Sequence, residues 1–270
     1  MALTAICARI NTPIFSIKHP EAFQIGAALP MPQPSTLVGA LAYCLGVYKG
    51  TGTKSLEEVR KAVVIARAKL LKGCTVVTPV ILRRFRVLDK GLEAKTKGEV
   101  AAFEKACSAL QAGDFYSFKR TIEMELTDAL YREYLSHASV KCIWVLREPY
   151  KSELLYLLQR LGDTESLVTV IEAWSADCRE AEADQIDTEY PFTLAPEVLE
   201  CISGDYTTLK MCDEFRRLKM YCIPCKKEIS STPSGIKYFT YTTTKVEIRL
   251  KRPQRFFMVN DEKVIGGHAP

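Results

Sequence analysis

Residues 26–48, GAALPMPQPSTLVGALAYCLGVY, constrain the fold of this chain more than any other segment. Three prolines at alternate positions hold residues 30–34 extended, because proline fixes φ and disfavours a helical conformation in the residue before it. A helix therefore begins only after them, with either Ser35 or Thr36 as the N-cap, since a hydroxyl there can accept a hydrogen bond from a first-turn amide. The helix that follows is apolar and rich in glycine and alanine, which predicts close packing against a sheet.

The start of this helix is also a candidate ligand site. A helix N-terminus presents N–H groups without intrahelical partners and a partial positive charge, which suits a phosphate group. Lys18 and His19 precede the loop and could reach a phosphate held there. A plainer interpretation, a proline-rich turn into a buried helix, stays open on these residues alone.

The composition is that of an ordinary globular protein with a mild excess of positive charge. Of 270 residues, 47% are hydrophobic and 26% charged, and the net charge is +5. The sequence pI of about 8.6 lies below the value above about 9 that is typical of dedicated nucleic-acid domains, so the position of the basic residues must carry any such argument. The first residues lack the basic and apolar regions of a signal peptide, and no apolar run approaches the ~20 residues of a membrane span. We therefore expect a cytoplasmic protein with no membrane contact.

Cofactor motifs are not evident. Of the ten cysteines, only Cys222 and Cys225 have metal or redox spacing, and a zinc site would need a second pair, for which Cys201 and Cys212 are available. A disulfide also remains open for a hyperthermophilic source. The segment GVYKGTGTKS nearly spells a phosphate-binding loop, but Thr53 stands where the motif needs lysine. We expect no metal and no nucleotide cofactor.

The first half of the chain is predicted to contain two strands around two helices. Residues 3–10 alternate like a strand, and residues 55–73, SLEEVRKAVVIARAKLLKG, indicate a helix with a capping box from Ser55 to Glu58. A buried strand then starts at Cys74. The basic residues of the second helix are predicted to form a solvated face; they are Arg60, Lys61, Arg67, Lys69 and Lys72.

The strand from Cys74 becomes basic around an aromatic residue, in the run Arg83, Arg84, Phe85 and Arg86. Arginine beside an exposed ring suits single-stranded RNA, because the charge meets phosphate and the ring stacks on a base. Charges that protect an edge strand are the alternative. Residues 89–122 then resemble an insertion, with a helical piece near residues 99–110. Lys119 and Arg120 lie beside three aromatic residues in that insertion.

The second half is predicted to complete an α+β fold. We expect a short helix and then a strand at Val140–Leu146, a helix at Pro149–Gly162 and a strand at Ser166–Trp174. The order strand, helix, strand, strand, helix, strand is the split βαβ, or ferredoxin-like, arrangement. Acidic residues 175–190 indicate a linker. The tail is predicted to hold a helix near Pro196–Cys201, a basic segment FRRLKMYCIPCKKE, and two strand-like runs that either form a β-rich lobe or extend the first sheet.

Two motifs in this order resemble the Cas-five family of type I CRISPR effector complexes. They are PQPSTLVGALAYCLG, after a leading strand and an extended loop, and GDTESLVTV at Gly162–Val170, which is similar to the archaeal type I-A branch. The resemblance covers residues 1–175 well. It implies a ferredoxin-like (RRM-like, RAMP) domain at residues 1–175 with a thumb inserted at about 84–122, followed by a linker and a smaller β-rich region at residues 176–270.

This resemblance implies a non-catalytic, RNA-binding subunit in antiviral defence. It would hold the 5′ repeat-derived handle of the guide RNA (crRNA) and cap the backbone filament of a type I-A Cascade ribonucleoprotein. The implied partners are the crRNA, the Cascade backbone subunit, a large subunit and a recruited helicase-nuclease, with target DNA only indirectly bound. The candidate RNA-binding residues are Lys18, His19, Gln33, Ser35, Thr36, Arg83, Arg84, Phe85, Arg86, Lys119 and Arg120.

Two alternatives remain from the residues. The first is a metal-independent endoribonuclease that processes repeat RNA, for which His19, Lys18 and Tyr43 form the one constellation worth testing, because His137 and His268 match no catalytic pattern. The second is a scaffold that never touches RNA. Residues 162–166, GDTES, are predicted to be mainly structural, since glycine can end a helix and Asp163, Thr164 and Ser166 can satisfy a tight turn.

Overall fold

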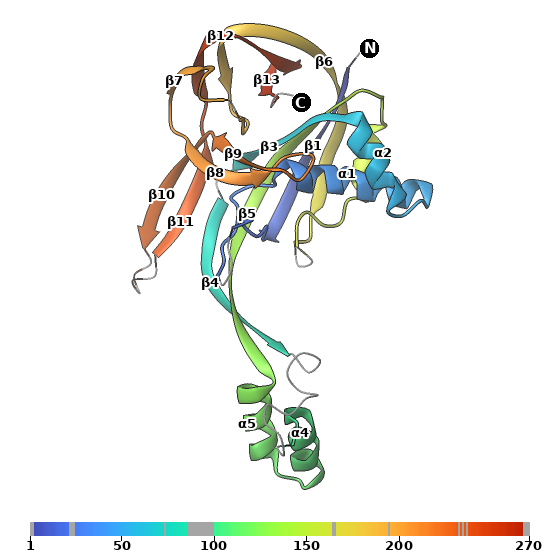
Figure 1. Ribbon diagram of the computed structural model, residues 1–270, viewed down its shortest axis with the longest axis vertical. Coiled ribbons are helices and arrows are strands. Elements are labelled where there is room, and N and C mark those ends of the chain that lie inside the picture. Colours follow the sequence, from blue (N-terminus) through green and yellow to red (C-terminus); the bar gives the residue numbers. More distant parts are fainter. Residues whose placement is uncertain are drawn as a thin grey trace. The chain divides into compact units, whose positions relative to one another are not determined.

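The chain divides into two units in the computed structural model (Figure 1). The first contains Met1–Ala22, Ala27–Thr78 and Glu133–Pro270, and the second contains Phe23–Gly26 and Pro79–Arg132. The structure describes residues 3–21, 25–72, 74–85, 100–163, 166–193, 195–231, 233, 235 and 237–266.

An antiparallel sheet organises the first unit. Strand β1 (Thr4–Phe15) pairs with β5 (Thr127–Leu146) on one side and with β6 (Thr169–Thr188) on the other, and β3 (Val63–Lys72) pairs with the far edge of β5. All three pairings are antiparallel. The helix-and-sheet mixture confirms the predicted α+β class, and β1 confirms the predicted first strand.

Alternation along the strands builds a core on each face of this sheet. Ile6, Ala8 and Ile10 of β1 join one apolar cluster, whereas Ala5 and Cys7 join another, because successive strand side chains point to opposite faces. Helix α1 (Pro34–Lys49) covers the first face together with α2 (Lys54–Ala62) and the 3-10 helix η1 (Ser152–Leu157).

Helix α1 forms where the sequence predicts it, but its cap differs. Gln33 is the N-cap residue and makes no side-chain cap hydrogen bond, and Pro34 is the first helical residue, where its missing N–H has no cost. Ser35 and Thr36 therefore lie inside the first turn, so the prediction that one of them caps the helix was wrong. The buried indole of Trp144 donates to the Leu37 carbonyl oxygen at 2.9 Å and holds this first turn on the sheet.

The predicted helix at residues 55–73 forms only in its first part, up to Ala62, and the rest of the prediction was wrong. Helix α2 ends at Ala62 and the chain continues as β3, because the run of β-branched residues from Val63 to Ile65 fits a strand paired with β5. Ser55 lies inside α2 and not at its N-cap, so the predicted capping box does not form. Its hydroxyl oxygen lies within hydrogen-bond distance of the carbonyl oxygens of Ala42 (2.8 Å) and Gly52 (2.7 Å). Arg67 and Lys69 are buried, so the predicted solvated face is wrong for both.

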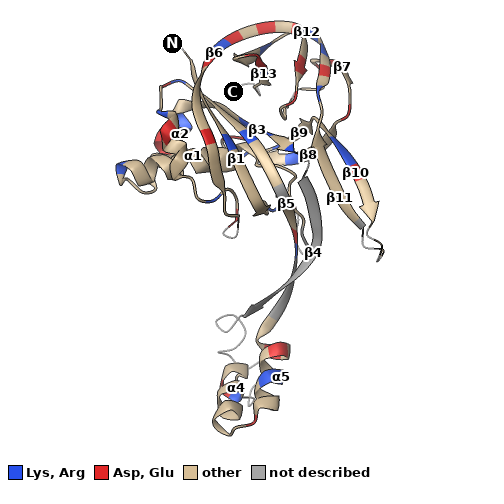
Figure 2. Ribbon diagram, turned by 180° about the vertical axis from the view of Figure 1, so that it is seen from behind, with Lys and Arg blue, Asp and Glu red and all other residues tan. Residues whose placement is uncertain are grey.

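The predicted acidic linker at residues 175–190 was also wrong. It is the second half of β6, which pairs with β12 (Val246–Val259) from Cys178 to Thr188. Figure 2 shows acidic residues in red along this strand. The charges are compatible with a strand because alternate residues of a strand lie on the same face. Glu180 and Glu182 lie on one face, and both pair with Arg255 of β12.

Three smaller helix predictions also failed. Only η1 forms within the expected helix Pro149–Gly162, and β5 already begins at Thr127, where a short helix was expected before Val140. Strand β7 (Leu199–Ser203) replaces the expected helix near Pro196–Cys201, because Leu199–Ile202 pairs with β12. In each case tertiary pairing overrides a weak local helical pattern.

Apart from β8 and β9, the remaining strands extend the first sheet, which is one of the two arrangements that the sequence allows for the tail. Strand β13 (Glu262–Ile265) pairs with β12. Strand β11 (Lys237–Thr243) pairs with β10 (Cys225–Ser231) and with β4 (Cys74–Phe85). Strands β8 (Thr207–Cys212) and β9 (Leu218–Ile223) form a separate hairpin.

The second unit contains a helical hairpin. Helices α4 (Ala102–Gln111) and α5 (Phe115–Glu125) enclose a small core that includes Ala106 and Leu126, and β2 (Ile25–Gly26) pairs with β5. The Asp114 carboxylate caps α5 by accepting from the Ser117 N–H at 3.0 Å. Lys119 and Arg120 are exposed on α5. The expected insertion at 84–122 falls within this unit.

The described residues also bear on metals, cysteines and membranes. Cys222 lies in β9 and Cys225 begins β10, and all nine cysteines described are free. In the same described part of the chain, no group of three or more potential metal ligands comes together. Among the helices described, none has the length and apolar character needed to cross a membrane.

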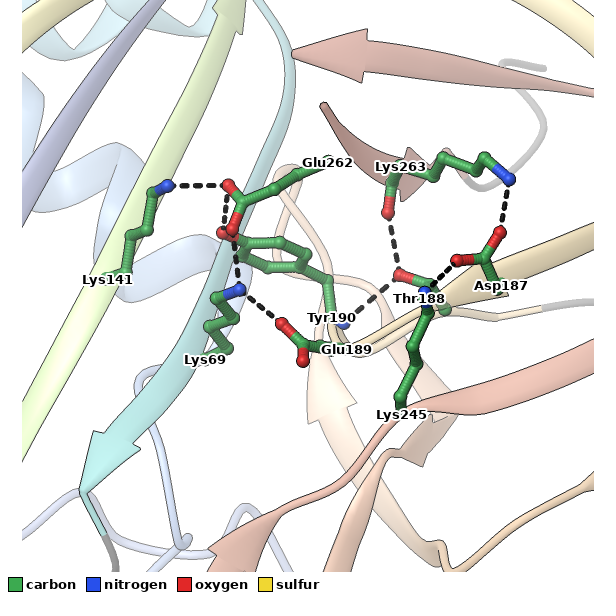
Figure 3. A network of polar contacts seen from close by, with 9 residues as sticks. All are labelled: Lys69, Lys141, Asp187, Thr188, Glu189, Tyr190, Lys245, Glu262 and Lys263. Carbon is green, nitrogen blue, oxygen red and sulfur yellow. Dashed lines mark hydrogen bonds and ion pairs between the residues drawn. The ribbon is translucent and has the colours of Figure 1, made fainter. Parts of the chain in front are cut away.

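A partly buried polar network joins β13 to β3 and β5 (Figure 3). The Glu262 carboxylate accepts from Lys69 at 2.5 Å, Lys141 at 2.7 Å and the Tyr190 hydroxyl at 2.9 Å. Glu189 also pairs with Lys69. Burial alone would raise the pKa of Glu262, but the hydrogen bonds from Lys141 and Lys69 outweigh burial and lower it. The network therefore stabilises the end of the described chain on the sheet.

Replacing Glu262 by Gln should make stability less sensitive to acid. Because the pKa of this carboxyl is lowered in the folded state, its stabilisation is complete above its usual value of 4.5 and is lost as pH falls below it. We expect Glu262→Gln to lower the free energy of unfolding by about 1–3 kcal/mol at neutral pH. The deficit should shrink as pH falls below that value in urea titrations. The exposed neighbour Asp261→Asn is the control, and an equal deficit at every pH would contradict the assignment.

Candidate nucleic-acid interface

A groove with a volume of about 790 Å³ opens at the start of α1. Four segments that are distant in the sequence form its walls: the residues after β1, the first half of α1, the segment after η1, and the β8–β9 turn. The lining residues are Ile17, Lys18, Gln33, Ser35, Thr36, Gly39, Ala40, Tyr43, Gln159, Arg160, Gly162, Asp163, Cys212 and Arg216. The fold thus brings the two sequence motifs, at residues 32–46 and 162–170, to one surface.

Gly162 fixes the second motif against the chain that follows β1. Its φ of +107° is a conformation that suits glycine, and a Cβ there would lie 2.6 Å from Ile17 Cγ1 and 3.1 Å from the Ser16 carbonyl oxygen. The Ser16 N–H donates to Ser166 Oγ at 3.0 Å, and the Asp163 N–H donates to the Ser16 carbonyl oxygen at 3.3 Å. Gly162 and Ser166 therefore have a structural role, but Gly162 does not end a helix as predicted, since η1 already ends at Leu157. Thr164 lies outside the described residues.

Gln33 joins the β8–β9 hairpin to the start of α1. Its side-chain oxygen accepts from the Cys212 N–H at 2.9 Å. Its backbone carbonyl accepts from the Thr36 and Leu37 N–H groups at 3.0 and 3.2 Å. A residue expected to contact RNA thus also holds one wall of the groove in place.

Three cations line the groove: Lys18, Arg160 and Arg216, with Asp163 as the acidic member. Arg216 reaches it from the tight β8–β9 turn, where its φ is +64°. Asp213 builds that turn, since its Oδ1 accepts from the N–H groups of Phe215 at 2.9 Å and Arg217 at 2.8 Å. Sequence reasoning missed Arg160 and Arg216, although the first precedes GDTES by two residues and the second lies in the basic segment FRRLKMYCIPCKKE.

A buried ion pair anchors the same turn to the sheet. Arg67 Nη1 of β3 lies 2.5 Å from Glu214 Oε1, and the two side chains are 1% and 11% exposed. The same carboxylate oxygen accepts from the Ala66 N–H at 3.0 Å. Burial alone would lower the pKa of Arg67, but the Glu214 charge outweighs burial and raises it, so Arg67 stays protonated. Arg67 thereby positions the turn that carries Arg216.

The structure places the other predicted RNA-binding residues as follows. Lys18, Ser35 and Thr36 line the groove, whereas His19 is not among its lining residues, and its Nδ1 accepts from the Glu21 N–H at 3.2 Å. Side chains of β4, including Arg83, Arg84 and Phe85, lie outside the described residues, as does Arg86. Lys119 and Arg120 belong to the second unit.

The comparisons with known proteins agree on one family. The family model described as CRISPR-associated protein (Cas_Cas5) matches residues 5–140. A relative from Thermoproteus tenax, named CRISPR-associated protein Cas5, is 26% identical over 221 residues, which are 81% of this chain and 84% of the relative. A protein of the same name from Methanocaldococcus jannaschii is 27% identical over 198 residues, 68% of each chain.

A solved structure is also similar in fold. The crystal structure of a CRISPR protein from Archaeoglobus fulgidus superposes with a TM-score of 0.59 at 16% identity, covering 98% of this chain and 100% of that chain. At this level of identity the similarity concerns the fold alone.

Proposed function

Because this chain belongs to the Cas5 family of CRISPR-associated proteins, we propose that it is a non-catalytic subunit that binds guide RNA in the groove at the start of α1. One observation carries the proposal. Two motifs that are distant in the sequence line one groove together with three cations, at a helix N-terminus. That combination suits the phosphate backbone of a single strand.

The groove supplies each element of phosphate capture. Lys18, Arg160 and Arg216 supply charge, and the Ser35 N–H at the second helical position has no intrahelical acceptor. The Ser35 and Thr36 hydroxyls can donate to phosphate oxygens. Tyr43, which is 47% exposed, offers a ring on which a base can stack.

The finer assignment follows the resemblance. We propose that the bound segment is the 5′ repeat-derived handle in a type I-A Cascade complex, with the backbone subunit, the large subunit and a recruited helicase-nuclease as partners. The strand order β6-β1-β5-β3, with α1 after β1 and η1 after β5, supports a ferredoxin-like fold whose second helix is reduced to η1.

Removing the groove cations should weaken RNA binding. In the variant Lys18→Ala/Arg160→Ala/Arg216→Ala, three phosphate contacts are lost, so we expect affinity for handle RNA to fall by about tenfold or more at physiological salt. The slope of log K against log salt should become shallower by about 2, at 0.7 per contact. Fluorescence anisotropy at several salt concentrations measures both quantities.

The matched control removes the same charge elsewhere. Lys54, Lys251 and Arg252 are exposed and lie outside the groove, so their triple alanine variant should bind RNA nearly as the natural chain does. Equal losses in the two triple variants would show that only overall charge matters. The groove assignment would then be rejected.

A second function, cleavage of repeat RNA, has one supporting observation. Lys18 and Tyr43 line the same groove and His19 is adjacent to Lys18 in the chain. Incubating the pure protein with repeat RNA and a metal chelator tests it. We expect intact RNA; a single clean product that disappears in Tyr43→Phe would replace the non-catalytic proposal with an endoribonuclease.

A further inference from the structure

A hollow with a volume of about 770 Å³ lies beside the β8–β9 turn and shares no lining residue with the groove. Phe215 and Arg217 of the turn line the hollow, whereas Arg216 between them lines the groove. The other apolar residues of its lining come from β3, from β12 and from the chain before β1; they are Leu3, Val63, Val64, Ile65, Pro253 and Phe257. Part of this apolar surface is open to solvent, since Leu3 and Val64 are half-buried and Phe215 is 51% exposed.

The charged residues of this lining leave only positive charge without an ion-pair partner. All four acidic residues of the lining are engaged in ion pairs: Glu180 and Glu182 with Arg255, Asp213 with Lys219, and Glu214 with Arg67. Among the described residues, Arg147 and Arg217 have no carboxylate partner, and both are exposed. Arg147 Nη1 donates only to an uncharged acceptor, the Lys61 carbonyl oxygen, at 3.1 Å. The complementary occupant therefore carries carboxylates.

The backbone of β3 beside the hollow already has hydrogen-bond partners at Ala66. The Ala66 N–H donates to Glu214 Oε1 at 3.0 Å, and the Ala66 carbonyl oxygen accepts from Arg67 Nη1 at 2.7 Å. An additional strand would need these two backbone groups in order to pair with β3 at this position. The occupant must therefore be held by its side chains.

We propose that this hollow docks a segment of a partner protein in which acidic residues flank apolar ones. The apolar side chains of the segment lie on Val64 and Phe215, and its carboxylates pair with Arg147 and Arg217. Exposed apolar surface bordered by charge is typical of protein-binding sites. RNA fits less well, because it carries a charge at every phosphate and the lining holds four acidic residues beside five basic ones. The proposal does not depend on guide-RNA binding.

Selection from a phage-displayed library of random dodecapeptides on the full chain tests this proposal. Depleting the library on the Arg147→Ala/Arg217→Ala variant removes peptides that bind elsewhere, including those that bind the cationic groove. We expect enriched sequences in which acidic residues flank apolar ones. If no sequence is enriched, or if the enriched sequences lack acidic residues, the proposal is overturned.

Fluorescence anisotropy with an enriched peptide measures the contribution of each part of the lining. Affinity should fall about fivefold or more in Arg147→Ala/Arg217→Ala because two charge pairs are lost, and severalfold in Phe215→Ala because apolar contact is lost. Lys54→Ala/Lys151→Ala removes two exposed cations outside the hollow and should leave affinity unchanged. Equal losses in the two double variants, or full affinity in Phe215→Ala, would place the peptide elsewhere.

Charge reversal separates docking from a folding defect. Arg147→Glu/Arg217→Glu should lose the acidic peptide and bind a version of it in which lysine replaces each acidic residue. The melting temperature should stay nearly the same, because both arginines are exposed. Failure of the lysine version to bind the folded variant would refute the pairing. Displacement of the acidic peptide from the natural chain by a single-stranded octaribonucleotide or by dodecanoate would assign the hollow to RNA or to a lipid and overturn the proposal.

Discussion

Replacing Arg67 by Met is expected to lower the free energy of unfolding by about 3–5 kcal/mol, the cost of removing one partner of a buried ion pair. The Glu214 carboxylate would keep only the Ala66 N–H, and its charge would remain in a site that is largely shielded from water. The cation–π contact of Arg67 with Tyr221, at 5.3 Å, would also be lost. Urea denaturation followed by circular dichroism measures the change.

Two further variants identify the cause. Lys72→Met changes a cation on the same strand that is exposed, so it should shift stability by less than about 0.5 kcal/mol. Arg67→Met combined with Glu214→Gln removes the uncompensated charge and should recover much of the loss. If Arg67→Met were as mild as Lys72→Met, the ion pair would not anchor the β8–β9 turn.

Replacing Gly162 by Ala is expected to damage both stability and RNA binding. The strained φ alone costs about 1–3 kcal/mol, and the added Cβ would lie 2.6 Å from Ile17 Cγ1 and 3.1 Å from the backbone oxygen of Ser16. Relieving that clash must shift residues 16–18 or 160–163, which carry Lys18 and Arg160 into the groove. We therefore expect weaker binding of handle RNA even at temperatures where the variant remains folded.

Gly39 provides the matched control for this substitution. It lies within α1, and a Cβ there would meet no atom within 4 Å, so Gly39→Ala should stabilise the chain by about 0.5–1 kcal/mol. Thermal melting of both variants compares their stabilities; RNA binding is not compared, because Gly39 lines the groove. Normal stability in Gly162→Ala would refute the claim that this backbone position requires glycine.

Local chemistry explains which parts could be predicted from sequence. The loop at residues 30–34, helix α1 and the turn at Gly162 depend on residues whose backbone preferences are strong by themselves. The strand β3 and the second half of β6 were misread because their charges resemble solvated surface. Arg67 and Lys69 become acceptable inside only because Glu214 and Glu262, 147 and 193 residues away, meet them there.

The sequence by itself determined the close-packed first helix, because the backbone preferences of proline, glycine and small apolar residues act locally. It also determined the α+β class and, through two motifs in order, the family. Tertiary structure alone decided that Arg160 and Arg216 join Lys18 in one groove, since each comes from a different segment whose position depends on long-range pairing. Buried charges have no local signature, because only their distant partners make burial affordable in free energy.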